Sequence, residues 1–306
     1  MELPDELKNL YRHWNKHISK STNKAQLTDV IHDQRLSQDV SYFITERMSI
    51  WSRRHVGKPA PYTQDPILSQ FRFCNILREL DRQTIEYHQL LLPLRDDFVL
   101  WLLNMFYARM VARPATVRDV GLLSFDMDEN ERILRNLRQH AKPVYGTPYV
   151  FPVSTILRSA TPTREEFIAR HLPSVMTQVA NEISSWDQES VLAGVSKILP
   201  AFGFNHEFLW TEVLIDVAYQ YPDKVDLFAP FPIGPGAAPT LQRISQTEDP
   251  SDIVYKLGRL KLPSGLYYED TPIVLSAENW EGVCCEFRKY TNLSNGKGRR
   301  RIYHQG

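Results

Sequence analysis

WSRRHVGKPAPYTQDPILSQFRFCNILRELDRQT, residues 51–84, joins the end of one helical pattern to the start of another across a proline-rich loop. Upstream of the loop, apolar residues recur every three or four positions and predict one amphipathic helix: Val40, Phe43, Ile44, Met48 and Trp51. A glycine and two prolines between positions 57 and 61 end that helix. Asp65 followed by Pro66 is typical of an N-cap with proline at the first helical position. The sequence therefore predicts a second helix from Pro66 to Gln89, within a signature region over residues 47–90.

Helical periodicity dominates the rest of the chain. The segment RDDFVLWLLNMFYARMVARP, residues 95–114, is apolar on all sides and predicts a central, enclosed helix. Thr163, with Glu166 three positions later, has the pattern of a capping box. Strand signals are few, and KPVYGTPYVFPV alternates only weakly between its prolines. We therefore expect an all-α protein, a single helical domain over residues 1–306, with a long irregular Gly/Pro loop over residues 228–251.

The composition is that of a globular protein, with 42% hydrophobic residues and 36 Lys+Arg against 36 Asp+Glu. Any DNA binding must therefore come from local charge and not from a net basic field. The three cysteines lack CxxC spacing, which disfavours a zinc site and a disulfide framework. The sequence has no run of eighteen apolar residues and no signal-peptide pattern. We expect a cytoplasmic protein, in the host cell if the source is viral, without membrane association.

Four polar residues of the predicted second helix fall at positions i, i+3, i+4 and i+7 and would share one face: Asn75, Arg78, Glu79 and Arg82. Such a face can be a solvated salt-bridge stripe. The two arginines are nevertheless like charges four residues apart, which is unfavourable unless an anion or a carboxylate lies between them. The adjoining loop contributes Trp51, Arg54 and Tyr62, a combination suited to a planar base beside a phosphate.

A second pattern is KILPAFGFNHEFLWTEVLIDV, residues 197–217, where Leu-Pro-x-x-Gly stands between two predicted helices. This is typical of a helix-hairpin-helix, expected here over residues 190–220, whose backbone amides receive a DNA phosphate. Gly203 would supply the tight turn. The same pattern also ends ordinary helix pairs, so both interpretations stay open.

Two further segments carry glycines or positive charge. In FPIGPGAAPTLQR, Gly234 and Gly236 flank a proline and allow a chain reversal or a close approach to a ligand. No GK[ST] follows, so the segment is not a Walker loop. The basic tail over residues 290–306 ends in GKGRRRIYHQG, which is either a solvated end or a DNA contact through local charge: Lys297, Arg299, Arg300 and Arg301.

Residues 51–84 resemble the signature of the alpha-glutamyl/putrescinyl thymine pyrophosphorylase clade, which shares its helical domain with the hydroxymethyluracil DNA kinase helical-domain family. The shared letters include Asp-Pro-Ile-Leu and Arg-Glu-Leu-Asp-Arg. GPGAAPTL resembles the glycine segment of that clade, and CCEFRKYTNLSNGKGRRRIY resembles its Cys-Glu-Phe end with a basic tail. The chain departs from the pattern at Cys74, Thr240 and Arg288, where the clade has Thr, Gly and Asp.

The resemblance implies a helical, DNA-glycosylase-like fold and a role in thymidine hypermodification, chiefly of bacteriophage DNA. The implied enzyme is a transferase that acts after a hydroxymethyluracil DNA kinase on double-stranded DNA containing modified thymidine. It displaces pyrophosphate from 5-pyrophosphoryloxymethyluracil with an amino acid or polyamine co-substrate. The alternatives are a DNA glycosylase acting on a modified pyrimidine and a non-catalytic DNA-binding module.

The chemistry of this reaction suggests a role for each candidate residue. Guanidinium groups form bidentate contacts with phosphate oxygens, so Arg54, Arg78 and Arg82 are assigned to pyrophosphate binding. Asn75 is assigned to substrate binding beside them. Base catalysis is assigned first to Glu79, then to Asp81, then to Asp226, whose distance after Gly203 is similar to that of the catalytic Asp in hairpin glycosylases. Trp51 and Tyr62 would stack on a flipped base. DNA contacts are expected from Gly203, Gly234, Gly236, Lys289 and the four basic tail residues. No cofactor is expected, although Mg²⁺ could assist departure of pyrophosphate.

Overall fold

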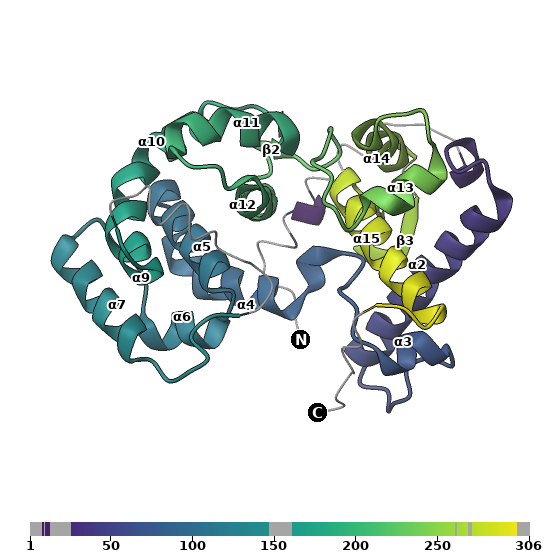
Figure 1. The fold of residues 1–306 in the computed structure, drawn as a ribbon, viewed down its shortest axis with the longest axis horizontal. Coiled ribbons are helices and arrows are strands. Elements are labelled where there is room, and N and C mark those ends of the chain that lie inside the picture. The colour runs from purple at the N-terminus through teal and green to yellow at the C-terminus, as the bar shows by residue number, and fades with distance from the viewer. Residues whose placement is uncertain are drawn as a thin grey trace. The chain divides into compact units, whose positions relative to one another are not determined.

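The computed structural model describes residues 8, 10–12, 26–146, 161–260, 262–268 and 271–298. The described chain is mostly helical, which confirms the all-α class (Figure 1). It divides into two compact units: unit 1 combines Met1–Asp81 with Leu227–Gly306, and unit 2 is Arg82–Asp226. The single domain over residues 1–306 stays a prediction. None of the described helices combines the length and the hydrophobicity that a bilayer crossing requires.

Unit 2 is built around α5 (Phe98–Val111), which packs against α10 (Leu172–Ser184), α12 (Glu207–Gln220) and α6 (Pro114–Val120) (Figure 1). Every residue of α5 from Trp101 onward is buried. The enclosed central helix predicted from the all-round apolar segment is confirmed, because a helix without a polar face is stable only when other helices cover it.

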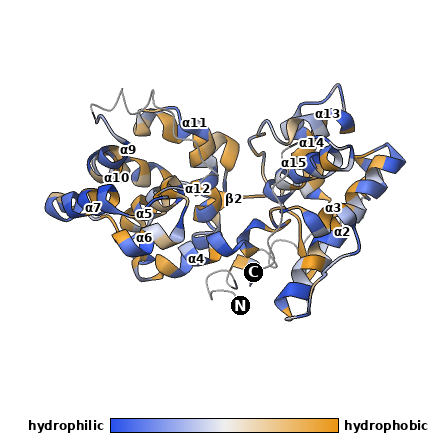
Figure 2. Ribbon diagram, turned by 60° about the horizontal axis from the view of Figure 1, so that its bottom comes forward, coloured by the Kyte–Doolittle hydropathy of each residue, from blue (hydrophilic) through white to orange (hydrophobic). Residues whose placement is uncertain are grey.

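The other elements of unit 2 surround this core. Thr163 is the N-cap of α9, its hydroxyl accepting a hydrogen bond from the Glu166 N–H at 3.2 Å, which confirms the cap but not the full capping box, because the Glu166 carboxylate accepts from the Thr163 hydroxyl and not from its backbone. Figure 2 shows α7 as largely hydrophilic, and its residues Ile133, Leu134 and Leu137 are buried. The remaining bounds in this unit are α4 (Arg82–Leu90), η3 (Leu92–Leu94), α7 (Met127–Gln139), α9 (Arg164–Glu166), the π-helical turn η4 (Phe167–His171), β1 (Glu189–Ser190), α11 (Val191–Phe202) and β2 (Val225–Asp226).

Helices α11 and α12 are consecutive and joined by a short turn. Gly203 has a φ of +80°, which favours glycine, and its N–H donates to the Leu199 carbonyl at 2.9 Å. Packing of His206 against aromatic rings fixes the turn. The centroid of the His206 ring lies 6.0 Å from that of Phe202 and 6.5 Å from that of Phe167. The helix pair agrees with the sequence pattern, while its use as a DNA-binding hairpin stays a prediction.

Burial lowers the pKa of His206 from 6.5 to about 4. Between these pH values the unfolded chain binds more protons than the folded protein does. The contribution of neutral His206 to the free energy of unfolding is therefore fully present above pH 6.5 and is lost as the pH falls toward 4. The lost contribution approaches about 3 kcal/mol. We expect His206→Phe, whose ring suits the aromatic surroundings, to flatten this dependence in urea unfolding at pH 7.5, 5.5 and 4.5. Equal pH slopes for both proteins would show that another group causes the loss.

Unit 1 is organised around α15 (Ala277–Ser294), which contacts helices from both halves of the chain (Figure 1). On α2, residues Val40, Phe43, Ile44 and Met48 are buried, as the apolar spacing predicted. The other elements are η1 (Leu27–Asp29), α2 (Gln34–His55), α3 (Pro66–Gln70), η2 (Arg78–Leu80), α13 (Ala238–Ile244), α14 (Pro250–Arg259), and the antiparallel pair β3 (Pro263–Tyr268) and β4 (Thr271–Val274).

The predicted helix from Pro66 to Gln89 is wrong. Asp65 does cap a helix, accepting from the Ile67 and Leu68 N–H groups at 2.8 Å each, but α3 ends at Gln70. Phe71 is extended, with φ −109° and ψ 147°, and the chain becomes helical again only in η2 and α4. Because the helix is broken, the four polar residues at helical spacing do not share one helix face.

Two other expected segments also differ. The loop predicted over residues 228–251 contains α13, and α14 begins at Pro250, so its irregular part is shorter than expected. The basic tail predicted from residue 290 starts inside α15, which continues to Ser294. Both segments combine turn-forming residues with apolar ones that are buried, such as Leu241 and Leu293, and this packing favours helix.

Candidate functional site

The backbone of the segment Arg72–Asn75 is held by charged side chains from distant parts of unit 1. Arg47 of α2 donates from Nη2 to the carbonyls of Phe73 and Cys74, at 3.2 and 2.8 Å. Lys289 of α15 donates from Nζ to the Arg72 carbonyl and lies 4.5 Å from the centre of the Phe73 ring. Three carbonyl groups of the segment, those of Arg72, Phe73 and Cys74, therefore bond to cations and not to helical N–H groups.

Two N–H groups of the segment bond to carboxylates. Cys74 N–H donates to Oε2 of Glu286 at 3.0 Å, and Asn75 N–H donates to Oδ1 of Asp81 at 3.2 Å. The Asn75 side chain adds a bond to the Leu80 carbonyl at 3.0 Å. Hydrogen bonds to ionised partners are stronger than neutral ones, which explains why the segment gives up helical bonding. We call Arg47, Cys74, Asp81, Glu286 and Lys289 the charged cluster.

Arg47 is the buried cation of the charged cluster, with 8% of its surface exposed. Desolvation lowers its pKa, while the charges of Glu286, Cys74 and Asp81 raise it. Its Nε–H has no acceptor among the residues that the structure describes. This donor is itself enclosed by protein, so a ligand oxygen can bond to it only if neighbouring side chains move.

Part of the surface of Cys74 is exposed, but protein atoms surround its thiol. Desolvation raises the pKa of its thiol, and the charges of Glu286 and Asp81 raise it further, against a smaller opposite effect of Lys289. The thiol is therefore protonated at neutral pH, and Cys74 lacks the low pKa of an activated nucleophile. Its environment carries negative charge as well as the positive charge of Arg47.

The four residues once expected on one face are distributed differently. Glu79 is fully buried, and the Tyr11 hydroxyl donates to its Oε1 at 2.9 Å. Arg78 is half-buried in η2 of unit 1. Arg82 begins α4 of unit 2, its side chain 81% exposed and paired with Glu86 four residues later at 2.6 Å. Their predicted roles as base and pyrophosphate ligands stay untested, although Arg82 has the surroundings of an ordinary surface ion pair.

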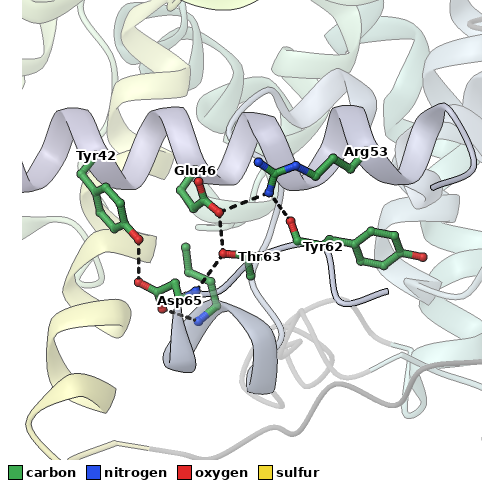
Figure 3. A network of polar contacts seen from close by, with 7 residues as sticks. Tyr42, Glu46, Arg53, Tyr62, Thr63 and Asp65 are labelled. Carbon is green, nitrogen blue, oxygen red and sulfur yellow. Dashed lines mark hydrogen bonds and ion pairs between the residues drawn. The ribbon is translucent and has the colours of Figure 1, made fainter. Parts of the chain in front are cut away.

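The loop between α2 and α3 is fixed by a polar network (Figure 3). Glu46 Oε1 accepts from the Thr63 hydroxyl at 2.5 Å and lies 3.5 Å from Nη1 of Arg53, which also donates to the Tyr62 carbonyl. These bonds hold the Tyr62 backbone beside α2. Arg54 is then placed over the Tyr62 ring, with its guanidinium carbon 5.8 Å from the ring centre.

Asp65 connects the same network to α15. Its Oδ2 accepts from the hydroxyls of Tyr42 and Tyr290, at 3.1 and 2.7 Å, while Oδ1 caps α3. The loop is thus tied to both long helices of unit 1. Trp51, expected to stack on a base, stacks on His55 in this structure, with ring centroids 4.7 Å apart.

Among the remaining predicted residues that the structure describes, Lys289 belongs to the charged cluster. Gly234 N–H donates to Oε1 of Glu281 at 3.1 Å, and a Cβ on Gly236 would overlap Sγ of Cys285, so both glycines serve close packing on α15. Asp226 pairs with Ser190 between β2 and β1 of unit 2. Lys297 is exposed just after α15, and Arg299, Arg300 and Arg301 lie outside the described residues. DNA contacts by these residues stay predictions.

Arg47 and Glu286 are the residues that sequence reasoning missed. A signal existed for Arg47, because it lies three residues after Ile44 and four before Trp51, inside the apolar stripe of the predicted helix. A charged residue in such a stripe requires a buried partner. Glu286 lies in the Cys-Glu-Phe block that carried the resemblance. In the described part of the chain, no three His, Cys, Asp or Glu side chains are grouped to hold a metal ion.

Comparison with known proteins adds the family. Residues 34–299 match the family model described as "5-hmdU DNA kinase, helical domain". The 5-hmdU DNA kinase of Bacillus phage SP10 is 29% identical over 293 residues, an alignment that covers 82% of this chain and 44% of the phage protein. The chain therefore spans less than half the length of this relative. No solved structure matches. Because the family model covers most of the chain, the protein belongs to the family of 5-hmdU DNA kinase helical domains.

Proposed function

We propose that this protein is a DNA-modifying transferase of thymidine hypermodification, which displaces pyrophosphate from 5-pyrophosphoryloxymethyluracil in DNA with an amino acid or amine. The family description and the phage relative both name 5-hmdU DNA, which supports a substrate derived from 5-hydroxymethyluracil. The resemblance of residues 51–84 to the pyrophosphorylase clade supports the transfer step.

The observation that carries the proposal is the charged cluster at the centre of the signature region. It combines a buried guanidinium, Arg47, with the carboxylates of Asp81 and Glu286 on one short segment. The charge of Arg54 also acts on Arg47, so positive charge from two turns of α2 gathers there. A site that expels a polyanion and deprotonates an amine needs both signs of charge close together.

Each group has a defined task in this reaction. The leaving pyrophosphate is stabilised by bidentate contacts with arginine, for which Arg47, Arg54 and Arg78 are the proposed donors. The incoming amine is mostly ammonium at neutral pH, with a pKa of roughly 8 to 10, so a carboxylate must accept its proton. Among the predicted bases the structure favours Asp81 over Glu79, because Glu79 is enclosed and bonded to Tyr11.

A DNA-presenting role is the second candidate. The matching family model describes one domain of a kinase, and the phage relative extends well beyond this alignment. The sequence itself has no GK[ST] loop to hold a nucleotide. In this alternative the helical chain binds modified DNA, and another protein or domain transfers the phosphate.

One assay separates these functions. A duplex carrying 5-pyrophosphoryloxymethyluracil is incubated with the protein and a mixture of amino acids and polyamines, then digested to nucleosides and analysed by mass spectrometry. A transferase yields a new nucleoside whose mass equals that of the amine adduct, and it releases pyrophosphate. Abasic sites would indicate a glycosylase instead. Unchanged nucleosides together with DNA retention would support the presenting role and exclude transfer.

A further inference from the structure

We propose that Glu286 is the carboxylate that accepts the proton of the attacking amine. This inference rests on the proposed transferase function and names a catalytic residue for it. Glu286 comes from α15, more than 200 residues away from the segment Arg72–Asn75 that it contacts.

The geometry of Glu286 is that of an oriented, reachable carboxylate. Its Oε2 accepts the Cys74 N–H at 3.0 Å and lies 3.5 Å from Nζ of Lys289, one turn along the same helix. Two donors on one oxygen restrict the rotation of the carboxylate. The side chain remains 14% exposed, so it is neither enclosed nor freely solvated. A base that works beside a reactive electrophile needs this combination of fixed direction and limited access to water.

Its position also distinguishes Glu286 from the other carboxylates. Glu79 is fully buried and bonded to Tyr11. Asp81 shares the segment, but Glu286 affects the pKa of both Arg47 and Cys74 more strongly than Asp81 does. Arg47, a proposed pyrophosphate ligand, and Glu286 both bond to the backbone of Cys74, at 2.8 and 3.0 Å. A base close to that ligand is close to the carbon that the amine attacks.

The transfer exchanges one bond of the methylene carbon for another. The amine nitrogen forms a bond to the exocyclic methylene carbon at C5 of the uracil, and the bond between that carbon and the pyrophosphate oxygen breaks, its electron pair leaving with pyrophosphate. The proton lost by the nitrogen moves to Oε1 or Oε2 of Glu286 and then to water. No oxidant or cofactor is consumed.

The test compares two donors on the same DNA substrate at neutral pH. Glycine is present as an ammonium and needs a base, whereas trifluoroethylamine is largely uncharged and does not. We expect Glu286→Gln to reduce the initial rate with glycine by about 100-fold or more, and the rate with trifluoroethylamine by less than tenfold. The glutamine keeps an acceptor for the Cys74 N–H. Glu248→Gln, which removes an exposed carboxylate paired with Lys256, serves as the matched control and should leave both rates unchanged.

The outcomes distinguish this inference from the function on which it rests. Equal losses with both donors would show a structural role for Glu286, and wild-type rates with glycine would also overturn the assignment, while the transferase function would survive either result. If the wild-type protein itself forms no adduct, the proposed function fails and Glu286 loses its role with it. Glu286→Asp provides a second variant if the glutamine protein does not fold, and it should retain more glycine transfer than Glu286→Ala does.

Discussion

Replacing Arg109 with methionine should lower the free energy of unfolding by about 3–5 kcal/mol. In the core of unit 2, Arg109 forms a bidentate pair with Asp216, both N···O distances being 2.6 Å, and the two side chains are almost completely buried. His88 lies 3.3 Å from the same carboxylate, and Arg109 also donates to the Thr84 hydroxyl. Methionine retains the volume but leaves the Asp216 carboxylate without its guanidinium partner in a low-dielectric interior. The cost arises from that isolated charge.

Urea unfolding followed by circular dichroism measures this effect. The double variant Arg109→Met with Asp216→Leu should recover much of the loss, since it removes both charges together. Arg82→Met provides the matched control, because its partner Glu86 is near the surface, and should change stability by less than about 1 kcal/mol. A loss of less than 1 kcal/mol in Arg109→Met would mean that the interior relaxes or admits water.

Arg47→Met should affect both stability and turnover. Removing the guanidinium leaves the Phe73 and Cys74 carbonyls without their donor, which should cost about 2–4 kcal/mol. Turnover should fall by about 100-fold or more, because the proposed pyrophosphate ligand is lost and Cys74, whose N–H holds Glu286, is no longer fixed.

Rates of adduct formation, measured below the unfolding transition, separate the two consequences. Arg35→Met is the matched control on the same helix, because Arg35 is exposed near the start of α2 and makes no contact with the charged cluster. That variant should retain most of the activity. Near-wild-type turnover in Arg47→Met would remove Arg47 from the site, and a stability loss without an activity loss would show that its role is confined to holding the segment.

Local patterns were sufficient for much of the fold. The apolar stripe of α2, the enclosed α5 and the caps at Asp65 and Thr163 all depend on residues within one or two helical turns of each other. The β3–β4 pair was not predicted, although Leu266, Ile273 and Val274 are strand-favouring or apolar residues on either side of a short connection. Its signal was weak because prolines interrupt it.

The sequence by itself determined the helical class and the starts of α3 and α9, because these depend on residue types at short, regular spacing, and it indicated the family through three separate blocks of shared residues. Only the tertiary structure decided that residues 71–77 leave the helix, that Glu79 is enclosed, and that Arg47 and Glu286 approach the same segment. The physical reason is that a backbone group can form its hydrogen bond with a local partner or with a distant one. Cys74 N–H can bond to a carbonyl four residues earlier or to a carboxylate 212 residues later, and packing of α15 decides between them.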